Sequence, residues 1–260
     1  MKPAGGLLLT LAALAAAAPA MAGPWTMPKG DGQIIVKFEE MRATQGYDPD
    51  GVLTPLPAER RDTVVSVFAE YGLTSRLTLQ LKGDWQSGED YFVDFEGRGP
   101  LEVGVNWQVW RDDRTAVALY GGVADGGEGR NAGYAMPGMG GQDWEVRVAV
   151  GRSFGPVGWL NNGSTGGFAT LEVARRTRSG LPDETRLDAT LGAHFGDNWM
   201  LLSQAYAGEA DDGGPRWVSV ESSVVRRFGN WNAQVGWRTT LTGRETADAS
   251  GLVIGVWRRF

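Results

Sequence analysis

The sequence predicts an all-β protein, a transmembrane, antiparallel, up-and-down β-barrel of about 12 strands. Apolar and polar residues alternate with a period of two in several segments, as in residues 77–85, where one face carries Leu77, Leu79, Leu81 and Trp85. Short turns and long polar loops also alternate along the chain, which ends on an alternating strand at Phe260. Because such alternation suits a strand between two different solvents, the three observations together predict a barrel in a membrane.

The composition agrees with this fold class. Only 42% of the residues are hydrophobic, although the chain contains 39 glycines and 11 tryptophans. A barrel in lipid needs apolar residues only at every second strand position, so its average hydropathy stays modest. The chain has no cysteine, which excludes disulfides and thiol chemistry. Its net charge of −6 disfavours nucleic acid as a partner.

The N-terminal residues are typical of a secretory signal peptide. Lys2 supplies a positive charge, residues 7–18 are apolar, and Ala20-Met21-Ala22 forms a cleavage site of the small-x-small type. We therefore expect a cleaved signal peptide at residues 1–22 and a single barrel domain at residues 23–260. A membrane anchor is disfavoured because the apolar run is short and ends at the cleavage site.

The alternation places the 12 expected strands at regular intervals. They cover residues 33–42, 63–72, 76–86, 100–111, 115–124, 143–154, 167–177, 185–195, 199–208, 216–228, 231–241 and 251–260. Each is close to the length that a tilted strand needs to cross the hydrocarbon layer, about 9–11 residues. An even number of strands returns both ends of the barrel to the same side of the membrane.

The connections support this order. Short turns follow the even strands at residues 72–75, 112–114, 196–198 and 229–230, whereas long polar loops follow odd strands at residues 43–62, 87–99, 125–142 and 242–250. Short periplasmic turns and long extracellular loops are typical of bacterial outer-membrane barrels. The connection at residues 155–166 departs from the pattern because it is too long for a minimal turn.

Aromatic residues recur where strands reach the short turns. Aromatic-Gly pairs begin at Tyr71, Phe154, Phe195 and Phe228, and Trp199 and Trp231 open the strands after two of these turns. We expect an aromatic girdle at the membrane interface. The alternative, a soluble sandwich with aromatic core residues, does not explain why the same face carries Arg152, Arg226 and Arg258.

The whole mature chain resembles small proteobacterial outer-membrane β-barrels of the porin-like transporter type. The resemblance depends on the signal peptide, the run from Tyr71 to Leu79, the aromatic-Gly strand ends and the terminal Phe260. It implies a cell outer membrane location, contact with outer-membrane lipid and lipopolysaccharide, and passive diffusion of small molecules without covalent chemistry. It also implies that Phe260 is the signal read by the outer-membrane assembly machinery.

The inner face of the barrel is the candidate functional surface. By parity its acids are Glu39, Glu70, Asp84, Glu102, Glu145, Glu172, Asp188 and Glu221, and its bases are Lys37, Lys82, Arg147, Arg176, Arg186, Arg227, Arg238 and Arg259. The equal numbers argue against strong selectivity by charge sign. We expect ion pairs between neighbouring strands, such as Glu172 with Arg186 and Glu221 with Arg238. Such pairs either close a structural polar core or line a constriction for small polar solutes, and both alternatives remain open.

The preferred hypothesis is a channel or facilitator for passive diffusion of small polar solutes. Its predicted pore lining is Lys82, Asp84, Glu102, Asn106, Arg147, Glu172, Arg186, Asp188, Glu221 and Arg238. The alternative is a closed structural or surface-interaction barrel whose loops bind a partner or lipopolysaccharide. That alternative gains weight if Phe68, Trp110 and Trp257 meet across the barrel axis.

An enzyme acting on lipid is the third hypothesis, and the sequence gives it little support. His194 is the only histidine and is predicted to face inward at the periplasmic end of a strand. With a single histidine and no cysteine, zinc sites and Cys/His dyads are disfavoured. We therefore expect no catalytic residue, no metal site and no cofactor.

Overall fold

The structure is a computed structural model, and it describes residues 23–156 and 163–260. The predicted signal peptide and the centre of the predicted 155–166 connection lie outside the described residues. No helix in the described parts of the chain is long and apolar enough to cross a membrane.

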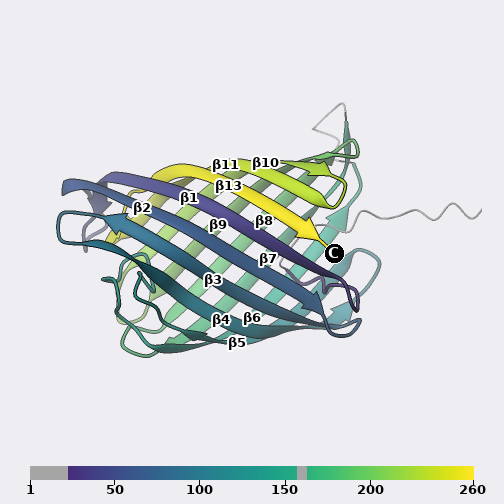
Figure 1. The fold of residues 1–260 in the computed structure, drawn as a ribbon, viewed down its shortest axis with the longest axis horizontal. Coiled ribbons are helices and arrows are strands. Elements are labelled where there is room, and N and C mark those ends of the chain that lie inside the picture. Colours follow the sequence, from purple (N-terminus) through teal and green to yellow (C-terminus); the bar gives the residue numbers. More distant parts are fainter. Residues whose placement is uncertain (1–22, 157–162) are drawn as a thin grey trace, which may run out of the picture.

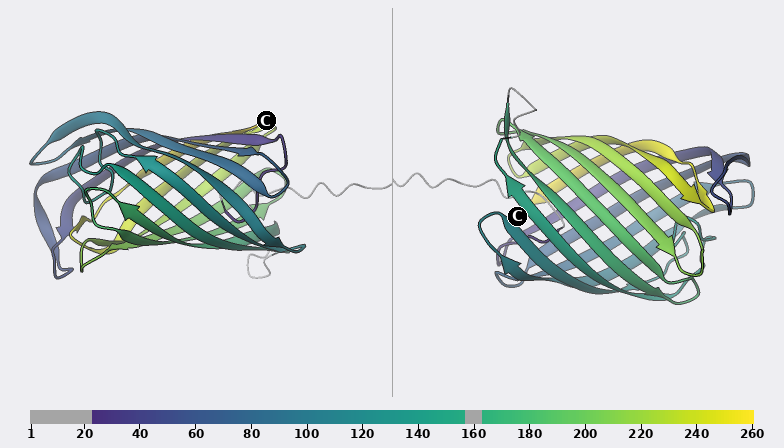
Figure 2. Two further views of the ribbon diagram at one scale, coloured as in Figure 1. Left: turned by 90° about the horizontal axis from the view of Figure 1, so that it is seen from below. Right: turned by 180° about the vertical axis from the view of Figure 1, so that it is seen from behind.

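Twelve long antiparallel strands in the described residues close into a barrel, as predicted (Figures 1 and 2). Each pairs with its neighbours along the chain, and the two-residue β12 pairs with β1. The strands are β1 (Gly32–Tyr47), β2 (Leu53–Gly72), β3 (Leu77–Glu89), β4 (Asp94–Arg111), β5 (Thr115–Asp125), β6 (Gln142–Phe154), β7 (Ser164–Arg178), β8 (Glu184–Phe195), β9 (Trp199–Ala210), β10 (Arg216–Phe228), β11 (Trp231–Arg244), β12 (Thr246–Ala247) and β13 (Ser250–Arg259).

The barrel closes where the last strand meets the first. In Figure 1, yellow β13 runs beside purple β1, and the two strands pair from Gln33 with Arg259 to Arg42 with Ser250. Beyond the last pair, the Gly32 N–H donates to Phe260 O at 2.8 Å and the Phe260 N–H donates to Gly32 O at 3.0 Å. Closure leaves no unpaired sheet edge, which a spanning structure requires because lipid offers backbone groups no hydrogen bonds.

The outer surface is apolar, as a lipid-facing wall should be. Alternate strand positions expose large hydrophobic side chains on all twelve long strands of the described residues, including Val67, Leu81, Val103, Val148 and Ile254. The end of the barrel that carries the short turns, here called the turn end, has exposed aromatic rings at Tyr71, Trp199, Phe228, Trp231 and Phe260. These positions agree with the predicted girdle.

Two of the predicted arginines stack on this girdle. The guanidinium carbon of Arg226 lies 5.0 Å from the Trp199 ring centre and 4.8 Å from that of Phe228. The guanidinium carbon of Arg258 lies 5.0 Å from the Trp231 ring centre. A cation held over aromatic faces at the membrane interface can extend its charge toward lipid phosphates.

The opposite end, here called the loop end, differs from the prediction in two places. The expected loops at residues 43–62 and 87–99 are wrong, because β1 and β2 continue to a tight turn at residues 48–52 and β3 and β4 to one at residues 90–93. Apolar alternation stops where the wall leaves the lipid. Backbone pairing does not depend on apolar side chains, so the hairpins continue into water.

A bulge corrects one predicted inward residue. The pairing of β4 with β5 shifts between Gln108 and Trp110, so Trp110 points outward and is 49% exposed. One extra residue in a strand reverses the face of every side chain beyond it. Phe68 and Trp257 do lie on the inner face, but Trp110 cannot meet them across the axis.

Candidate functional site

All ten residues of the predicted pore lining lie on the inner face of the barrel. Their positions alternate with exposed apolar residues, and each is buried or half-buried: Lys82, Asp84, Glu102, Asn106, Arg147, Glu172, Arg186, Asp188, Glu221 and Arg238. Most of these residues lie away from the ends of their strands. The structure therefore brings a belt of charged side chains together around the lumen.

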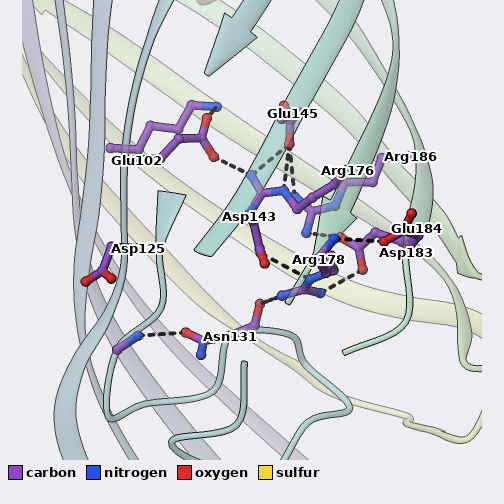
Figure 3. A network of polar contacts seen from close by, with 12 residues as sticks. Glu102, Asp125, Asn131, Asp143, Glu145, Arg176, Arg178, Asp183, Glu184 and Arg186 are labelled. Carbon is purple, nitrogen blue, oxygen red and sulfur yellow. Dashed lines mark hydrogen bonds and ion pairs between the residues drawn. The ribbon is translucent and has the colours of Figure 1, made fainter. Parts of the chain in front are cut away.

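One part of this belt lies on the wall formed by β3 to β8 (Figure 3). Arg176 lies between two carboxylates, since its guanidinium contacts Glu102 and its Nη2 lies 2.7 Å from Glu145 Oε2. Lys82 Nζ lies 3.2 Å from Glu102 Oε1. Arg147 contacts Glu145 as well. Glu102 and Glu145 therefore each have at least one cation, as buried charges require.

The other part lies on the wall formed by β10, β11, β13 and β1. Glu221 Oε2 accepts from Arg238 Nη2 at 2.6 Å and from Lys37 Nζ at 3.3 Å. Arg238 Nη1 also donates to Glu39 Oε2 at 2.8 Å. Lys37 of β1 reaches Glu221 of β10 across β13 and β11, and its register partner on β13 is Gly255. The two groups form facing charged walls inside one lumen.

One of the two expected ion pairs is confirmed. Glu221 pairs with Arg238, whereas the expected pairing of Glu172 with Arg186 is wrong. Glu172 Oε2 instead lies 3.0 Å from Arg147 Nη1, and Arg186 contacts Glu184 on its own strand. The register offers Glu172 diagonal arginines on both neighbouring strands, and Glu184 takes the one on β8.

Glycines in the lumen make room for an aromatic ring within the belt. Tyr120 Oη donates to Glu102 Oε1 at 2.6 Å. Its ring lies against Gly104 of β4 and Gly122 of its own strand β5, since a Cβ atom at either position would lie 2.3 Å from the hydroxyl oxygen. Both positions therefore need glycine if Tyr120 is to reach the carboxylate.

The turn end of the lumen holds the chain segment that precedes β1. Asn106 Nδ2 donates to Gly23 O at 3.0 Å, and Gln108 Nε2 donates to Pro24 O at 2.9 Å. The Met27 N–H donates to Thr78 Oγ1 at 2.9 Å. Residues 23–28, here called the N-terminal segment, therefore lie inside the barrel. They cover Asn106, so this member of the predicted lining does not face open lumen.

Apolar side chains fill the same end. A buried cluster of Phe168, Met200, Leu202, Val225 and Trp257 packs with Trp25 and Ile35. The rings of Trp25 and Phe168 meet edge to face, with centres 6.4 Å apart. His194 faces inward at the turn end, as predicted, and its ring centre lies 5.9 Å from that of Phe168. Besides this aromatic neighbour, the positive charges of Arg227 and Arg259 lie near its imidazole.

A loop partly covers the loop end of the lumen. Residues 126–141, here called the mouth loop, connect β5 to β6 and fold inward (Figure 2). On one side the Arg130 N–H donates to Gln86 Oε1 of β3 at 2.8 Å, and Gln86 Nε2 donates to Arg130 O at 3.2 Å. Arg60 of β2 donates through Nη2 to Gly133 O at 2.9 Å.

Buried polar groups hold the other side of the mouth loop. Arg178 Nη2 of β7 donates to Asn131 O at 2.7 Å (Figure 3). Tyr134 Oη donates to Glu184 Oε2 of β8 at 3.1 Å, and its ring centre lies 6.0 Å from that of Trp217. Burial, and then the negative charge of Glu184, raise the pKa of Tyr134 to about 12. The loop is thus fixed to both sides of the mouth and narrows it.

Sequence reasoning missed five polar residues of this site. Three of them, Asp143, Arg178 and Glu184, lie two positions beyond predicted lumen residues, so extending the same alternation would have found them. The other two, Arg130 and Tyr134, belong to the mouth loop. Loop residues carry no periodicity, and nothing in the sequence shows that this loop turns inward.

Comparisons with known proteins agree on the fold. The sequence matches no protein-family model and no curated protein. The structure is similar to an outer membrane channel from Pseudomonas putida F1, with 11% identity and a TM-score of 0.65, covering 93% of this chain and 100% of that chain. It is also similar to the KdgM porin, with 9% identity and a TM-score of 0.54, covering 88% of this chain and 99% of the porin.

A third similar structure has a different role. The translocator domain of the autotransporter NalP from Neisseria meningitidis is 12% identical, with a TM-score of 0.51 and 90% of each chain covered. The chain therefore has the fold of outer-membrane porin-like β-barrels. Because channels and a translocator share that fold, function has to be argued from the lumen itself.

Proposed function

We propose that this protein is an outer-membrane channel for the passive diffusion of small polar solutes. The observation that carries the proposal is the charged belt, in which Lys37, Lys82, Arg186 and Arg238 remain partly exposed although they face the inside of the barrel. Side chains of a dry core would be covered. Exposed charged groups on facing walls indicate a lumen that water and small solutes can enter.

The same belt suggests how transport would work. A solute that enters past the mouth loop exchanges part of its hydration shell for hydrogen bonds from the lining arginines and lysines. It then moves down its concentration gradient, without a covalent step and without a catalytic residue or cofactor. The N-terminal segment and the apolar cluster occupy the turn end of the lumen, so we expect a small conductance.

The proposal includes the route to the membrane. Export through a cleaved signal peptide would leave residues 23–260 as a single barrel domain in contact with outer-membrane lipid and lipopolysaccharide. Phe260, whose exposed ring follows β13, would be read by the assembly machinery. The variant Phe260→Ala should then lower the amount of barrel assembled in cells while leaving refolding in detergent unchanged. Equal loss in both assays would contradict the assembly role.

Planar-bilayer recording tests the channel directly. Purified protein, refolded in detergent and shown to be folded by its heat-dependent mobility in gels, is added to a lipid bilayer under voltage. We expect discrete conductance steps that the unfolded protein does not produce. Folded protein that inserts and never opens a step would overturn the channel.

A second function is favoured by a specific observation, the filling of the turn end. If the N-terminal segment and the cluster around Phe168 and Trp257 close the lumen, the barrel is structural, and its loops bind a partner or lipopolysaccharide. The discriminating variant lacks residues 23–28. Silent full-length protein combined with a conducting deletion variant would support the closed barrel, whereas conductance in both supports the channel.

A further inference from the structure

We propose that the lumen favours small anions over cations, although its acids and bases are similar in number. This inference rests on the proposed channel function and names its solute class: inorganic anions and small organic carboxylates. It depends on three features of the charged belt, namely which charges face the water, which hydrogen-bond donors remain unused, and how the cations are distributed around the barrel.

The acids lie beneath the bases. Among the cations, the side chains of Lys82, Arg186 and Arg238 are 31%, 29% and 21% exposed. Their carboxylate partners Glu102, Glu184 and Glu221 are 5%, 0% and 0% exposed. The short carboxylates stay against the wall, and the long basic side chains extend over them. A solute in the lumen therefore contacts ammonium and guanidinium groups first.

The acids also have few hydrogen-bonding positions left. Glu221 accepts hydrogen bonds from Ser223 and Gln234 at Oε1, and from Lys37 and from Nε and Nη2 of Arg238 at Oε2. Glu102 accepts from Lys82 and Tyr120 at Oε1 and from Arg176 at Oε2. A carboxylate has about four acceptor sites in total, so these two have little capacity left to coordinate a passing cation.

The bases, in contrast, keep unused donors. An ammonium group has three N–H donors, and Lys82 donates to one protein acceptor, Glu102. The ammonium group of Lys37 lies 3.2 Å from Glu39 Oε1 and 3.3 Å from Glu221 Oε2, so it keeps one further donor. These free N–H groups can replace water around an anion.

The exposed cations surround the whole lumen. Lys37, Lys82, Arg147, Arg186 and Arg238 belong to β1, β3, β6, β8 and β11, and no two successive members are more than three strands apart in the sheet order. Two acids oppose them. Asp84 and Asp188 are half-buried, and neither has a cation within ion-pair distance in the described parts of the chain. Glu39 and Glu172, whose side chains are 13% and 12% exposed, add two more acids, and these are already paired with Arg238 and Arg147. The five bases therefore face four partly exposed acids, of which only two are unpaired, so the surface that a solute meets remains basic.

Reversal potentials measure this preference. Single channels are recorded with KCl at different concentrations on the two sides of the bilayer, at low ionic strength, because salt screens exposed charges. We expect a reversal potential of the sign set by chloride. Channels with a reversal potential set by potassium, or with none, would overturn the inference while leaving the channel function intact. Complete absence of channels would overturn the proposed function instead.

The double variant Lys82→Gln with Arg186→Gln identifies the groups responsible. One unit charge about 5 Å from an ion changes the local ion concentration about four-fold in a medium as polar as water, so we expect the chloride-to-potassium ratio to fall by about that factor or more. The matched control is Lys82→Arg with Arg186→Lys, which conserves both charges and should keep the ratio. Arg226→Gln removes a cation from the outer surface and should also keep it. An unchanged ratio in the charge-removing variant contradicts the inference.

Discussion

Replacing Arg178 by methionine tests whether the buried network at the loop end holds the barrel mouth together. The Arg178 side chain is 0% exposed. It donates to Asp143 Oδ2 at 3.1 Å, to Glu184 Oε2 at 3.0 Å and to Asn131 O at 2.7 Å. The variant therefore removes two ion pairs and the contact that fixes the mouth loop to β7.

The loss of stability depends on the buried carboxylates that the variant leaves without Arg178. Removing one partner of a buried ion pair typically costs about 3–5 kcal/mol, because the other charge stays buried. Here two carboxylates lose a partner, but each keeps a second cation: Arg176 Nη1 lies 3.7 Å from Asp143 Oδ2, and Arg186 contacts Glu184. These remaining cations reduce the penalty, so we expect the free energy of unfolding to fall by about 3 kcal/mol, the lower end of the range.

Urea unfolding in detergent or lipid vesicles, followed by tryptophan fluorescence, measures the loss. Arg175→Met is the matched control, because Arg175 lies on the same strand and also has two carboxylate partners. Those partners, Asp183 and Asp211, are on the outer surface, where solvent already screens the charges. The control should barely move the unfolding midpoint. Equal losses in the two variants would refute the argument that burial sets the cost.

Two further predictions concern the lumen and the mouth. Gly122→Ala should lower stability by about 1–3 kcal/mol because the new Cβ displaces Tyr120, whereas Gly121→Ala, whose Cβ meets nothing within 4 Å, should be tolerated in the same unfolding assay. Tyr134 keeps its proton to about pH 12, so its contact with Glu184 contributes fully below the unfolded value near pH 10 and is lost as the pH rises through about 12. An ultraviolet difference titration against Tyr134→Phe checks this, and a Tyr134 transition near pH 10 would contradict it.

The alternation of apolar and polar residues was enough to predict which side chains of the barrel wall face outward and which face inward. Leu79 and Leu81 face outward and Gln80 and Lys82 inward because the period of a strand is two, and no distant contact can change that alternation without a bulge. Trp110 faces outward against this alternation, and the bulge beside it leaves no signature in the sequence. The strands are also longer than predicted, because the alternation of apolar and polar residues ends before the backbone pairing of the strands does.

Which charged side chains pair with one another inside the lumen depended on the register between neighbouring strands. Glu221 and Arg238 lie directly opposite each other, so their pairing could be anticipated from two adjacent strands. The pairing of Glu172 with Arg147 depended on competition among several arginines, which strand order alone does not resolve. The inward fold of the mouth loop and the burial of the N-terminal segment bring together residues far apart in the chain, as in the contact between Asn106 and Gly23.

The amino-acid order by itself determined the fold class, the two faces of most strands and the charged character of the lumen, because each depends on side chains that alternate along a single strand. Tertiary structure alone decided that the acids lie beneath the bases and that both ends of the lumen are narrowed. Those features depend on how far each side chain extends from the barrel wall into the lumen, and the lumen exists only once the barrel has closed. A count of charges along the chain carries no information about that depth.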